Sequence, residues 1–342
     1  MQVDLFAIQP YMSLEDYATH SAFYCKLRSL IEAAHLMRNP QNPALAVFPE
    51  DLATFLVVAN RVGVIESATT MDEAFSRIGT RLMPNIVYTM ARFRTRSLKR
   101  AFFTWAAPQV WRIWYQTMTE LAKTYHMTIV AGSALMPENR LGLNTAHFAA
   151  QSADIYNFSF TVDPSGQVVY HTKKVNLVPT QEDVLDLTPG PLESALASCA
   201  WNGIPLATSI CYDGFSMPHT TTEPKFCSLI PLLDTRGVRL VAQPSANPWP
   251  WQDRWVFASK QDQRTRQQQW MAEGSYLALQ NCQSIEVIVN PQILLDMLDI
   301  HFDGSSMIIA RTLSGGVEIL SQSAGFQANP ANEEVLHATW DF

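Results

Sequence analysis

Short apolar runs along the chain alternate with longer segments in which apolar residues recur every three or four positions. This alternation is typical of α/β proteins, in which buried strands are connected by helices that cover the sheets. The runs that predict strands are VDLFAIQ near the start, ALAVF (44–48), TIVAG (128–132), FSFTV (158–162), QVVYH (167–171), PLATSI (205–210), RLVAQ (239–243) and the tail segments SMIIA, VEIL and VLHATW.

Helices are predicted from capping residues and from apolar stripes. Ser13, with Asp16 three residues later, resembles a capping box and predicts a helix that ends at the Asn-Pro pairs of 39–40 and 42–43. Another helix leads into TIVAG, a third lies between PLATSI and RLVAQ, and a fourth ends at about residue 273, before the segment YLALQ (276–280). The stripes are Tyr24, Leu27, Ile31 and Ala34 in the first helix and Trp111, Trp114, Tyr115, Met118 and Leu121 in the second.

The segment Asp163-Pro164-Ser165-Gly166 lies between two predicted strands and has the residues of a type I turn, so it predicts a hairpin. We find no internal repeat, low-complexity tract or linker in the sequence. A single domain over residues 1–342 is therefore expected.

Composition narrows the class of protein. The chain has 342 residues with 47% hydrophobic content, a net charge of −7 and a pI near 5.6, which argues against nucleic acid as the main partner. Its five cysteines include no CxxC pair, which predicts a reducing, cytoplasmic location rather than a disulfide framework or a zinc site. The start MQVDLFAIQP lacks the features of a signal peptide, and no apolar run is long enough to span a membrane.

One segment, at about 60–115, differs in composition from the rest and is interpreted as an inserted helical element. Its part 79–107 contains no acidic residue, and Pro84 and Pro108 are taken as its brackets. Two functions remain open for it: a lid over a pocket, or a cationic surface that contacts anionic lipid peripherally. Its basic and aromatic residues include Arg81, Arg92, Arg94, Arg96, Lys99, Arg100, Phe93, Phe102, Phe103 and Trp105.

Three reactive side chains stand at or just beyond the ends of predicted strands. Glu50 follows ALAVFP, Lys174 lies just past QVVYH, and Cys211 follows PLATSI. In α/β sheets the carboxyl ends of strands are where sites are built. Taken singly, each residue has an ordinary explanation. Glu50 could be a solvated loop carboxylate, Lys174 could form a solvent-exposed pair with Lys173, and Cys211 could be a small core residue.

Together the three residues make a chemically sensible set. A thiol needs a base to remove its proton, and a buried carboxylate at Glu50 can be that base. An ammonium at Lys174 can stabilise the oxyanion of a tetrahedral intermediate. Nucleophile, base and stabiliser suffice for acyl transfer from an amide.

The local sequences around these residues resemble the nitrilase (carbon-nitrogen hydrolase) superfamily, in its amidase-like branch. Phe48-Pro49-Glu50, the run Lys174 to Glu182 (KVNLVPTQE) and Ile210-Cys211-Tyr212-Asp213 are similar to its glutamate, lysine and nucleophile motifs, in the family's order. The resemblance extends over nearly the whole chain except roughly residues 60–115. Supporting segments are Thr128 to Ser133, Asn157, Asp163 to Gly166, Gln243 to Asn247 (QPSAN), Glu273 to Tyr276 with Gln280-Asn281, and Phe302 to Ser306.

The resemblance implies a four-layer α-β-β-α sandwich, a homodimer or higher homo-oligomer, a small-molecule amide substrate, and no cofactor or metal. It also implies that Glu50 is the general base, that Lys174 and the backbone N–H of Tyr212 stabilise the oxyanion, and that Cys211 forms a thioester. Glu182 matches a further glutamate of the family that holds the lysine and the substrate; the alternative is an ordinary loop carboxylate.

Departures from the family pattern bear on the substrate class. Lys173 stands where arginine is common, Gln243 replaces an asparagine, and Gly274-Ser275 replaces N-G. Tyr212 and Asp213 favour amides over nitriles. The segment PSANPWPW (244–251) is expected to line the pocket, although its tryptophans also suit a cover over the sheet end. The pocket candidates are Asn157, Asp213, Ser245, Ala246, Asn247 and Trp249.

Other functions were weighed against amide hydrolysis. His219 lies eight residues after Cys211, and this pair suggests the alternative of a Cys-His protease. A lone loop histidine, however, is usually structural or solvated. Nitrile hydrolysis or N-acyl transfer would use the same three residues, and a catalytically silent binding protein is a further alternative. Amide or N-carbamoyl hydrolysis is the expectation that the motifs favour.

Overall fold

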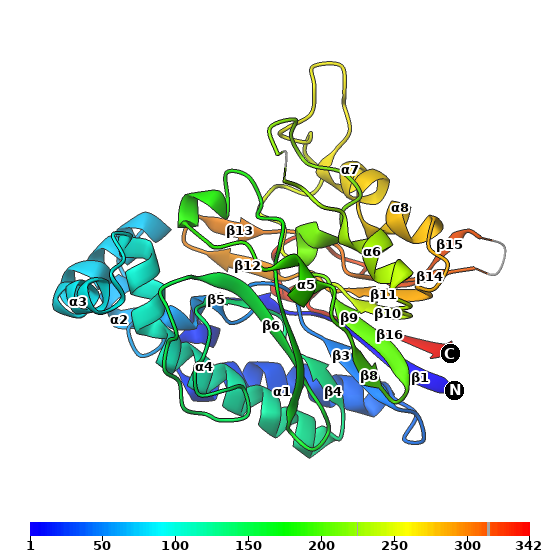
Figure 1. Cartoon of the computed structure of the whole chain (residues 1–342), viewed down its shortest axis with the longest axis horizontal. Helices are drawn as coiled ribbons and strands as arrows, with labels where there is room; N and C mark the ends of the chain where they lie inside the picture. The colour runs from blue at the N-terminus through cyan, green and yellow to red at the C-terminus, as the bar shows by residue number, and fades with distance from the viewer. Residues whose placement is uncertain (224, 313–314) are drawn as a thin grey trace.

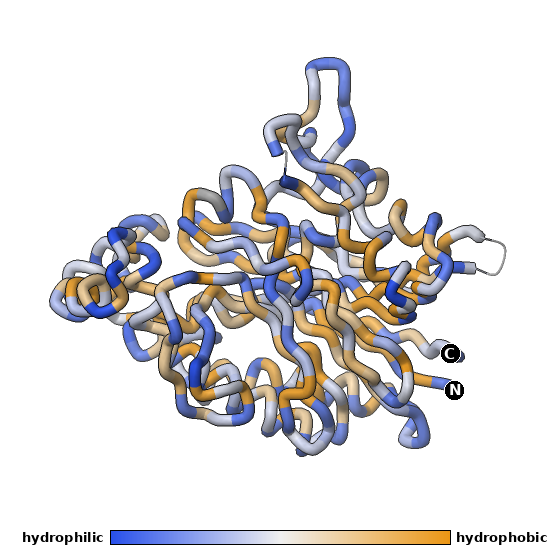
Figure 2. The backbone as a smooth tube through the Cα atoms, viewed as in Figure 1, coloured by the Kyte–Doolittle hydropathy of each residue, from blue (hydrophilic) through white to orange (hydrophobic). Residues whose placement is uncertain are grey.

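A computed structural model gives the structure of the chain and describes residues 1–223, 225–312 and 315–342. Within these ranges, two larger sheets and one small sheet form. The first sheet has the order β16-β1-β3-β4-β6-β5, with β7 paired to β6; the second has the order β15-β14-β11-β10-β9-β8; the third is β13-β12-β2. Figure 2 shows that the strands at the centre are largely hydrophobic, whereas many peripheral loops are hydrophilic.

The bounds of the elements follow the predicted apolar runs closely. The first sheet contains β1 (Gln2–Gln9), β3 (Ala44–Val47), β4 (Thr128–Val130), β5 (Ala134–Met136), β6 (Tyr156–Val162), β7 (Val168–Lys173) and β16 (Glu334–Asp341). The second contains β8 (Cys199–Trp201), β9 (Ile204–Thr208), β10 (Leu240–Ala242), β11 (Val287–Asn290), β14 (Met307–Arg311) and β15 (Val317–Gln322), and the third contains β2 (Tyr11–Met12), β12 (Leu294–Met297) and β13 (Ile300–Phe302).

Helices lie on the outer faces of the two larger sheets (Figure 1). The α-helices are α1 (His20–Met37), α2 (Val62–Ile65), α3 (Met71–Phe93), α4 (Leu98–Tyr125), α5 (Leu192–Ala195), α6 (Leu229–Thr235), α7 (Arg266–Glu273) and α8 (Ser275–Gln280). The 3-10 turns are η1 (Glu15–Tyr17), η2 (Thr54–Val58), η3 (Asp183–Leu185), η4 (Cys211–Gly214) and η5 (Pro330–Asn332). The segment YLALQ is thus helical.

The two larger sheets pack face to face, and the alternation of side chains along β1 shows how. Val3 and Leu5 join a core cluster with residues of the second sheet such as Leu206 and Val289, whereas Phe6 joins the cluster beneath α1 and α4. The outer face of the second sheet packs against α6 and α8 in a third cluster. The predicted α-β-β-α sandwich is confirmed.

The first helix does not begin where its capping box predicts. Ser13 and Asp16 do bond, since the Ser13 N–H and hydroxyl both donate to Asp16, but Asp16 lies in the single turn η1 and not in an α-helix. The α-helix begins at His20, where the Thr19 side chain accepts from the Ala22 N–H. The capping prediction was therefore wrong by one turn of structure.

The predicted brackets of the unusual segment are also wrong. Pro84 lies inside α3 and Pro108 inside α4, and both helices continue through them. Each proline removes one backbone hydrogen bond, which the packing of a long helix can offset. The break between the helices lies at Arg94, which has a left-handed backbone (φ 54°), and Ser97 caps α4.

Candidate active site

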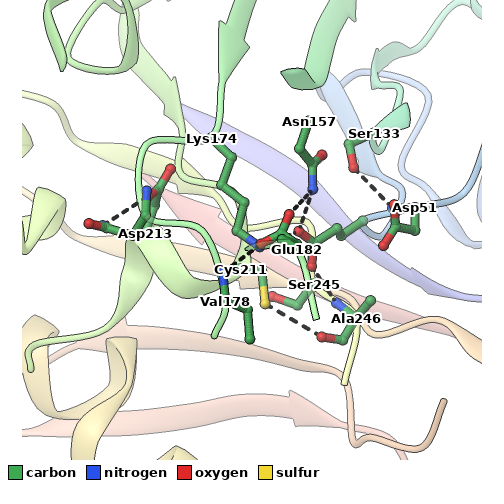
Figure 3. A network of polar contacts seen from close by, with 12 residues as sticks. Asp51, Ser133, Asn157, Lys174, Val178, Glu182, Cys211, Asp213, Ser245 and Ala246 are labelled. Carbon is green, nitrogen blue, oxygen red and sulfur yellow. Dashed lines mark hydrogen bonds and ion pairs between the residues drawn. The ribbon is translucent and has the colours of Figure 1, made fainter. Parts of the chain in front are cut away.

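Glu50, Lys174 and Cys211 come from different strand ends and line one cavity. Figure 3 shows Lys174 and Cys211 within the network of polar contacts at this place. Glu50 follows β3 and Lys174 follows β7, both in the first sheet, while Cys211 opens η4 just after β9 of the second sheet. The three strands deliver them to the same edge of the sandwich. The cavity has a volume of about 850 Å³.

Glu50 is buried, with 3% of its surface exposed, and both of its oxygens accept hydrogen bonds. Oε1 accepts from Lys174 Nζ at 2.7 Å and from Asn157 Nδ2 at 2.8 Å, and Oε2 accepts from the Ala246 N–H at 3.1 Å. Burial raises the pKa of Glu50, the ammonium of Lys174 opposes that shift, and the carboxylate of Glu182 adds to it. A carboxylate with a raised pKa is suited to accept and return a proton near neutral pH.

Lys174 bridges two carboxylates. Its Nζ lies 2.7 Å from Glu50 Oε1 and 2.6 Å from Glu182 Oε2. Burial alone lowers the pKa of Lys174, but Glu182 and Glu50 outweigh it and raise the pKa well above the ordinary value. The side chain is therefore a fixed ammonium, and two ion pairs leave one of its three N–H groups for another acceptor.

Glu182 is held in place by more than the lysine. Its Oε1 accepts from Asn157 Nδ2 at 2.9 Å, and its Oε2 accepts from the Val178 N–H at 2.9 Å. One asparagine on β6 thus connects both carboxylates that flank Lys174.

Cys211 adopts a left-handed backbone conformation (φ 47°), an uncommon one for a residue with a side chain. Its N–H donates to Pro244 O at 2.8 Å, and its thiol lies 3.5 Å from Ala246 O. Burial and the nearby Glu50 raise the pKa of the thiol, while Lys174 lowers it. The thiol is therefore protonated at neutral pH and needs a base before it can attack.

The turn that begins at Cys211 is hydrogen-bonded to the segment that follows Lys174. Asp213 accepts from the Val175 N–H at 3.0 Å, from the Asn176 N–H at 2.7 Å and from Asn176 Nδ2 at 2.9 Å. Burial raises the pKa of Asp213 to about 7, although the N–H donors favour its charged form. Asp213 thus ties the nucleophile turn to the segment that follows Lys174.

The glutamate turn is fixed by the neighbouring strand end. The Asp51 N–H donates to Ser133 Oγ at 2.9 Å. A Cβ on Gly132 would come within 2.2 Å of Pro49 O, and Gly132 has a φ of 71°, so only glycine allows this approach. Gly132 and Ser133, which end the supporting segment Thr128 to Ser133, therefore position the backbone that carries Glu50.

The cavity has a polar inner end and an apolar outer wall. The inner end contains the three strand-end residues together with Glu182 and Arg266. The outer wall comes largely from α3, which lies at the left in Figure 1, and from α4. Its apolar lining includes Phe75, Met83, Ile86, Leu98, Phe102 and Phe103.

The six pocket candidates divide into two groups. Ala246 and Trp249 line the cavity, whereas Asn157, Asp213, Ser245 and Asn247 are buried behind the lining and bond to other protein groups. In the QPSANPWPW segment, Pro248 also lines the cavity, while Trp251 packs in the core of the second sheet. Lys173 is not solvent-exposed either, because it is buried and paired with Glu138.

Sequence reasoning missed several lining residues, among them His219, Asp51 and Arg266. His219, interpreted as a structural or solvated loop residue, is buried, lines the cavity and stacks on Tyr212 with ring centroids 4.0 Å apart. Burial, with the charges of Arg266 and Lys174, lowers the pKa of His219 well below its ordinary value, so the ring is neutral. Asp51, whose pKa burial raises to about 7, and Arg266 were not singled out because no linear motif marks them.

Two absences hold for the described part of the chain. No group of three or more His, Cys, Asp or Glu side chains there is arranged to hold a metal ion. None of the helices described there is long and apolar enough to cross a membrane.

Solved structures share this architecture over almost the full chain. An amidase from Nesterenkonia sp. AN1, bearing acrylamide added at its active-site cysteine, matches with a TM-score of 0.54 and 13% identity, over 99% of this chain and 92% of that one. Saccharomyces cerevisiae Nit3, a member of branch 10 of the nitrilase superfamily, matches with a TM-score of 0.56 and 17% identity, over 99% and 90%. A carbon-nitrogen hydrolase from Helicobacter pylori G27 matches with a TM-score of 0.58 and 14% identity, over 100% and 90%.

In sequence, no family model and no curated protein matches the chain. Identities of 13–17% carry the architecture and not the activity of these neighbours. The chain therefore has the fold of the nitrilase superfamily.

Proposed function

We propose that the chain is a carbon-nitrogen hydrolase of the nitrilase superfamily that cleaves a small amide or N-carbamoyl compound, with Cys211 as nucleophile. The observation that carries this proposal is the arrangement of Glu50, Lys174 and Cys211 around one cavity, with the ammonium 2.7 Å from the carboxylate. The amidase and hydrolase neighbours support the reaction class.

In the first half-reaction, Glu50 takes the thiol proton as Cys211 Sγ bonds to the amide carbon. The developing oxyanion accepts from the free N–H of Lys174 and from the Tyr212 N–H. In the described part of the chain no acceptor is hydrogen-bonded to that backbone N–H. Protonated Glu50 then gives its proton to the leaving nitrogen, the carbon–nitrogen bond breaks, and ammonia or an amine departs from a thioester.

In the second half-reaction, water attacks the thioester. Glu50 removes a proton from the water as its oxygen bonds to the acyl carbon, and the same two donors stabilise the second oxyanion. The carbon–sulfur bond then breaks, the carboxylic acid is released, and the proton held by Glu50 returns to the Cys211 thiolate.

The segment 60–115 is proposed as an inserted lid. Its helices supply the outer cavity wall through Phe75, Phe102 and Phe103, while Arg92, Arg94 and Arg96 are exposed on its outside. This distribution supports the lid over the membrane-binding alternative, although both remain distinguishable by experiment.

The first test is trapping of the acyl-enzyme. Intact-mass spectrometry of the quenched protein, after mixing with a panel of amides, N-carbamoyl compounds and nitriles, is expected to show the acyl mass on the wild type and none on Cys211→Ala. Cys282→Ala, which removes another buried thiol that does not line the cavity, serves as the control and should retain the adduct. Turnover retained by Cys211→Ala would contradict the proposal.

A further inference from the structure

Arg266 is a buried charge that the proposed chemistry does not use. It is the first residue of α7, it is 2% exposed, and its side chain lines the same cavity as Cys211. The Thr265 side chain and Gln268 form a capping box that fixes this helix end. The position of Arg266 is therefore set by regular structure rather than by a loose loop.

The guanidinium lies among aromatic rings. Its Cζ is 4.2 Å from the ring centroid of Trp255, 4.9 Å from that of Trp270, 5.0 Å from that of Trp249 and 5.6 Å from that of Phe215. Ring faces attract a cation and exclude water from it, and the exclusion of water strengthens its interaction with any anion that arrives.

Amide oxygens take some of the N–H groups. Nε donates to Asn247 Oδ1 at 2.8 Å, and Nη1 donates to Gln269 Oε1. Nη2 has no acceptor among the residues that the structure describes, and no described carboxylate lies within ion-pair distance of the guanidinium. The edge formed by Nη1 and Nη2 thus keeps donors in the arrangement that a carboxylate can accept from in pairs.

The carboxylate that acts electrostatically on Arg266 is already engaged. Glu273 pairs with Arg264 at 2.8 Å and accepts from Gln269 Nε2 at 2.5 Å. Burial lowers the pKa of Arg266 to about 9, and Cys211 and then Glu273 oppose that shift, which places the guanidinium within electrostatic reach of the nucleophile. A buried cation without an anionic partner is costly, and it suits a site whose ligand brings the anion.

We propose that Arg266 binds a carboxylate of the substrate, at the end of the molecule away from the amide that Cys211 attacks. This inference rests on the proposed function and names its substrate class: amides that also carry a carboxylate. Trp249 and Trp255 then flank the ion pair, and the carbon chain of the substrate lies in the cavity between Arg266 and Cys211.

The kinetic test compares substrates that differ only in charge. Glutaric acid monoamide and pentanamide have the same length, with a carboxylate in place of a methyl group, and longer homologues form the same pairs. The wild type is expected to prefer the acid, and Arg266→Met is expected to lower kcat/KM for the acid by at least about tenfold while leaving the neutral amide within about threefold. Arg236→Met, which removes an arginine paired with exposed Glu193, controls for net charge.

If Arg266→Met lowered kcat/KM equally for the acid and for the neutral amide, the proposal would be overturned. Equal losses would indicate that Arg266 supports folding or stabilises the Cys211 thiolate. The absence of any preference for the acid in the wild type would overturn it as well. Arg266→Lys, which keeps the charge but loses the planar pair of donors, is expected to fall between the wild type and Arg266→Met.

A binding measurement separates this proposal from the proposed function. Calorimetric titration of the monoamide series into Cys211→Ala is expected to show binding that weakens at least about tenfold in Cys211→Ala/Arg266→Met. Binding that depends on Arg266 without turnover of any amide by the wild type would support the carboxylate site and contradict the hydrolase. Binding unchanged by Arg266→Met, or no binding of any homologue, would contradict the site itself.

Discussion

Two adjacent lysines at the end of β7 have different surroundings. Lys174 points into the cavity between Glu50 and Glu182, whereas Lys173 pairs with Glu138 and lies over the ring of Tyr156 at 4.2 Å. Both are buried, so burial alone does not distinguish them. Their partners do.

Substitution of the two lysines is expected to give opposite results. Lys174→Met removes the oxyanion donor and should lower kcat by at least about a hundredfold. Lys173→Met should leave kcat within about threefold and instead lower the melting temperature, because it breaks a partly buried ion pair. Steady-state kinetics and thermal unfolding of both variants check this, and similar kcat losses in the two would place the wrong lysine in the mechanism.

The charge of Glu182 is expected to set where activity is lost in acid. Glu50 must be deprotonated to act as a base, so kcat/KM falls as the pH drops through its pKa. Burial, together with the charge of Glu182, raises that pKa. Glu182→Gln removes the charge, lowers the pKa of Glu50 and should move the acid limb of the pH–rate profile to lower pH.

The matched control for Glu182 is Glu138→Gln, because Glu138 pairs with Lys173 and does not line the cavity. Its acid limb should coincide with that of the wild type. An acid limb in Glu182→Gln that stays in place, or moves to higher pH, would show that Glu182 does not act on Glu50 electrostatically.

For single residues, the sequence predicts a place in the site when the neighbours along the chain form a motif. Glu50, Lys174 and Cys211 each end a readable strand, and they do line one cavity. Arg266 and His219 gave no such signal, because their burial depends on aromatic residues far away in sequence, such as Trp249. Asp213 was misplaced for the same reason: adjacency to Cys211 does not reveal that its side chain turns away to Val175.

Among the elements, the turn η4 is fitted closely to β10. A Cβ built on Gly214 would come within 2.1 Å of Gln243 Nε2, and that same amide donates to Cys211 O at 3.0 Å. The Gln243 side chain thus occupies the space that the glycine leaves open beneath the Cys211 backbone.

Gly214→Ala is therefore expected to lower the free energy of unfolding by about 1–3 kcal/mol, as overpacking of a core typically does, and to lower kcat. Adding Gln243→Asn shortens the opposing side chain and should restore part of the loss. Gly63→Ala, where a Cβ meets nothing within 4 Å, is the control and should be neutral or stabilising. Urea unfolding of the four proteins measures this, and a Gly214→Ala variant as stable as the wild type would contradict the packing argument.

Element boundaries were predictable where local chemistry decides them. The hairpin turn at residues 163–166 formed as expected, with Asp163 Oδ1 accepting from the Ser165 and Gln167 N–H groups, both at 2.9 Å. The helices through Pro84 and Pro108 were not predictable in the same way, because their continuity depends on packing between α3 and α4.

On the scale of the whole molecule, α3 and α4 form much of the outer wall of the cavity beside the sandwich. Phe102 packs edge to face on Phe75, with centroids 5.2 Å apart, and both line the cavity. Arg92, Arg94 and Arg96 of the same segment are exposed and are not among the lining residues, whereas Lys99 is. The aromatic wall and these three arginines are therefore separable by mutation.

Phe102→Ala is expected to raise KM for amides with long apolar groups several-fold and to leave acetamide unaffected. The triple variant Arg92→Ser/Arg94→Ser/Arg96→Ser should leave both KM values unchanged, including those for acidic amides, because these arginines face away from the cavity. Co-sedimentation with anionic vesicles gives the opposing outcome: strong binding that the triple variant loses would favour a membrane surface over a lid.

The tryptophans around Arg266 also make ligand binding in the cavity observable by fluorescence. Three of the nine tryptophans in the chain lie within 5.0 Å of that one guanidinium. Indole emission depends on the local electric field, so an anion that neutralises Arg266 changes the field on all three rings together. The other tryptophans form a constant background, so ligand occupancy can be followed from the intrinsic fluorescence of the unlabelled protein.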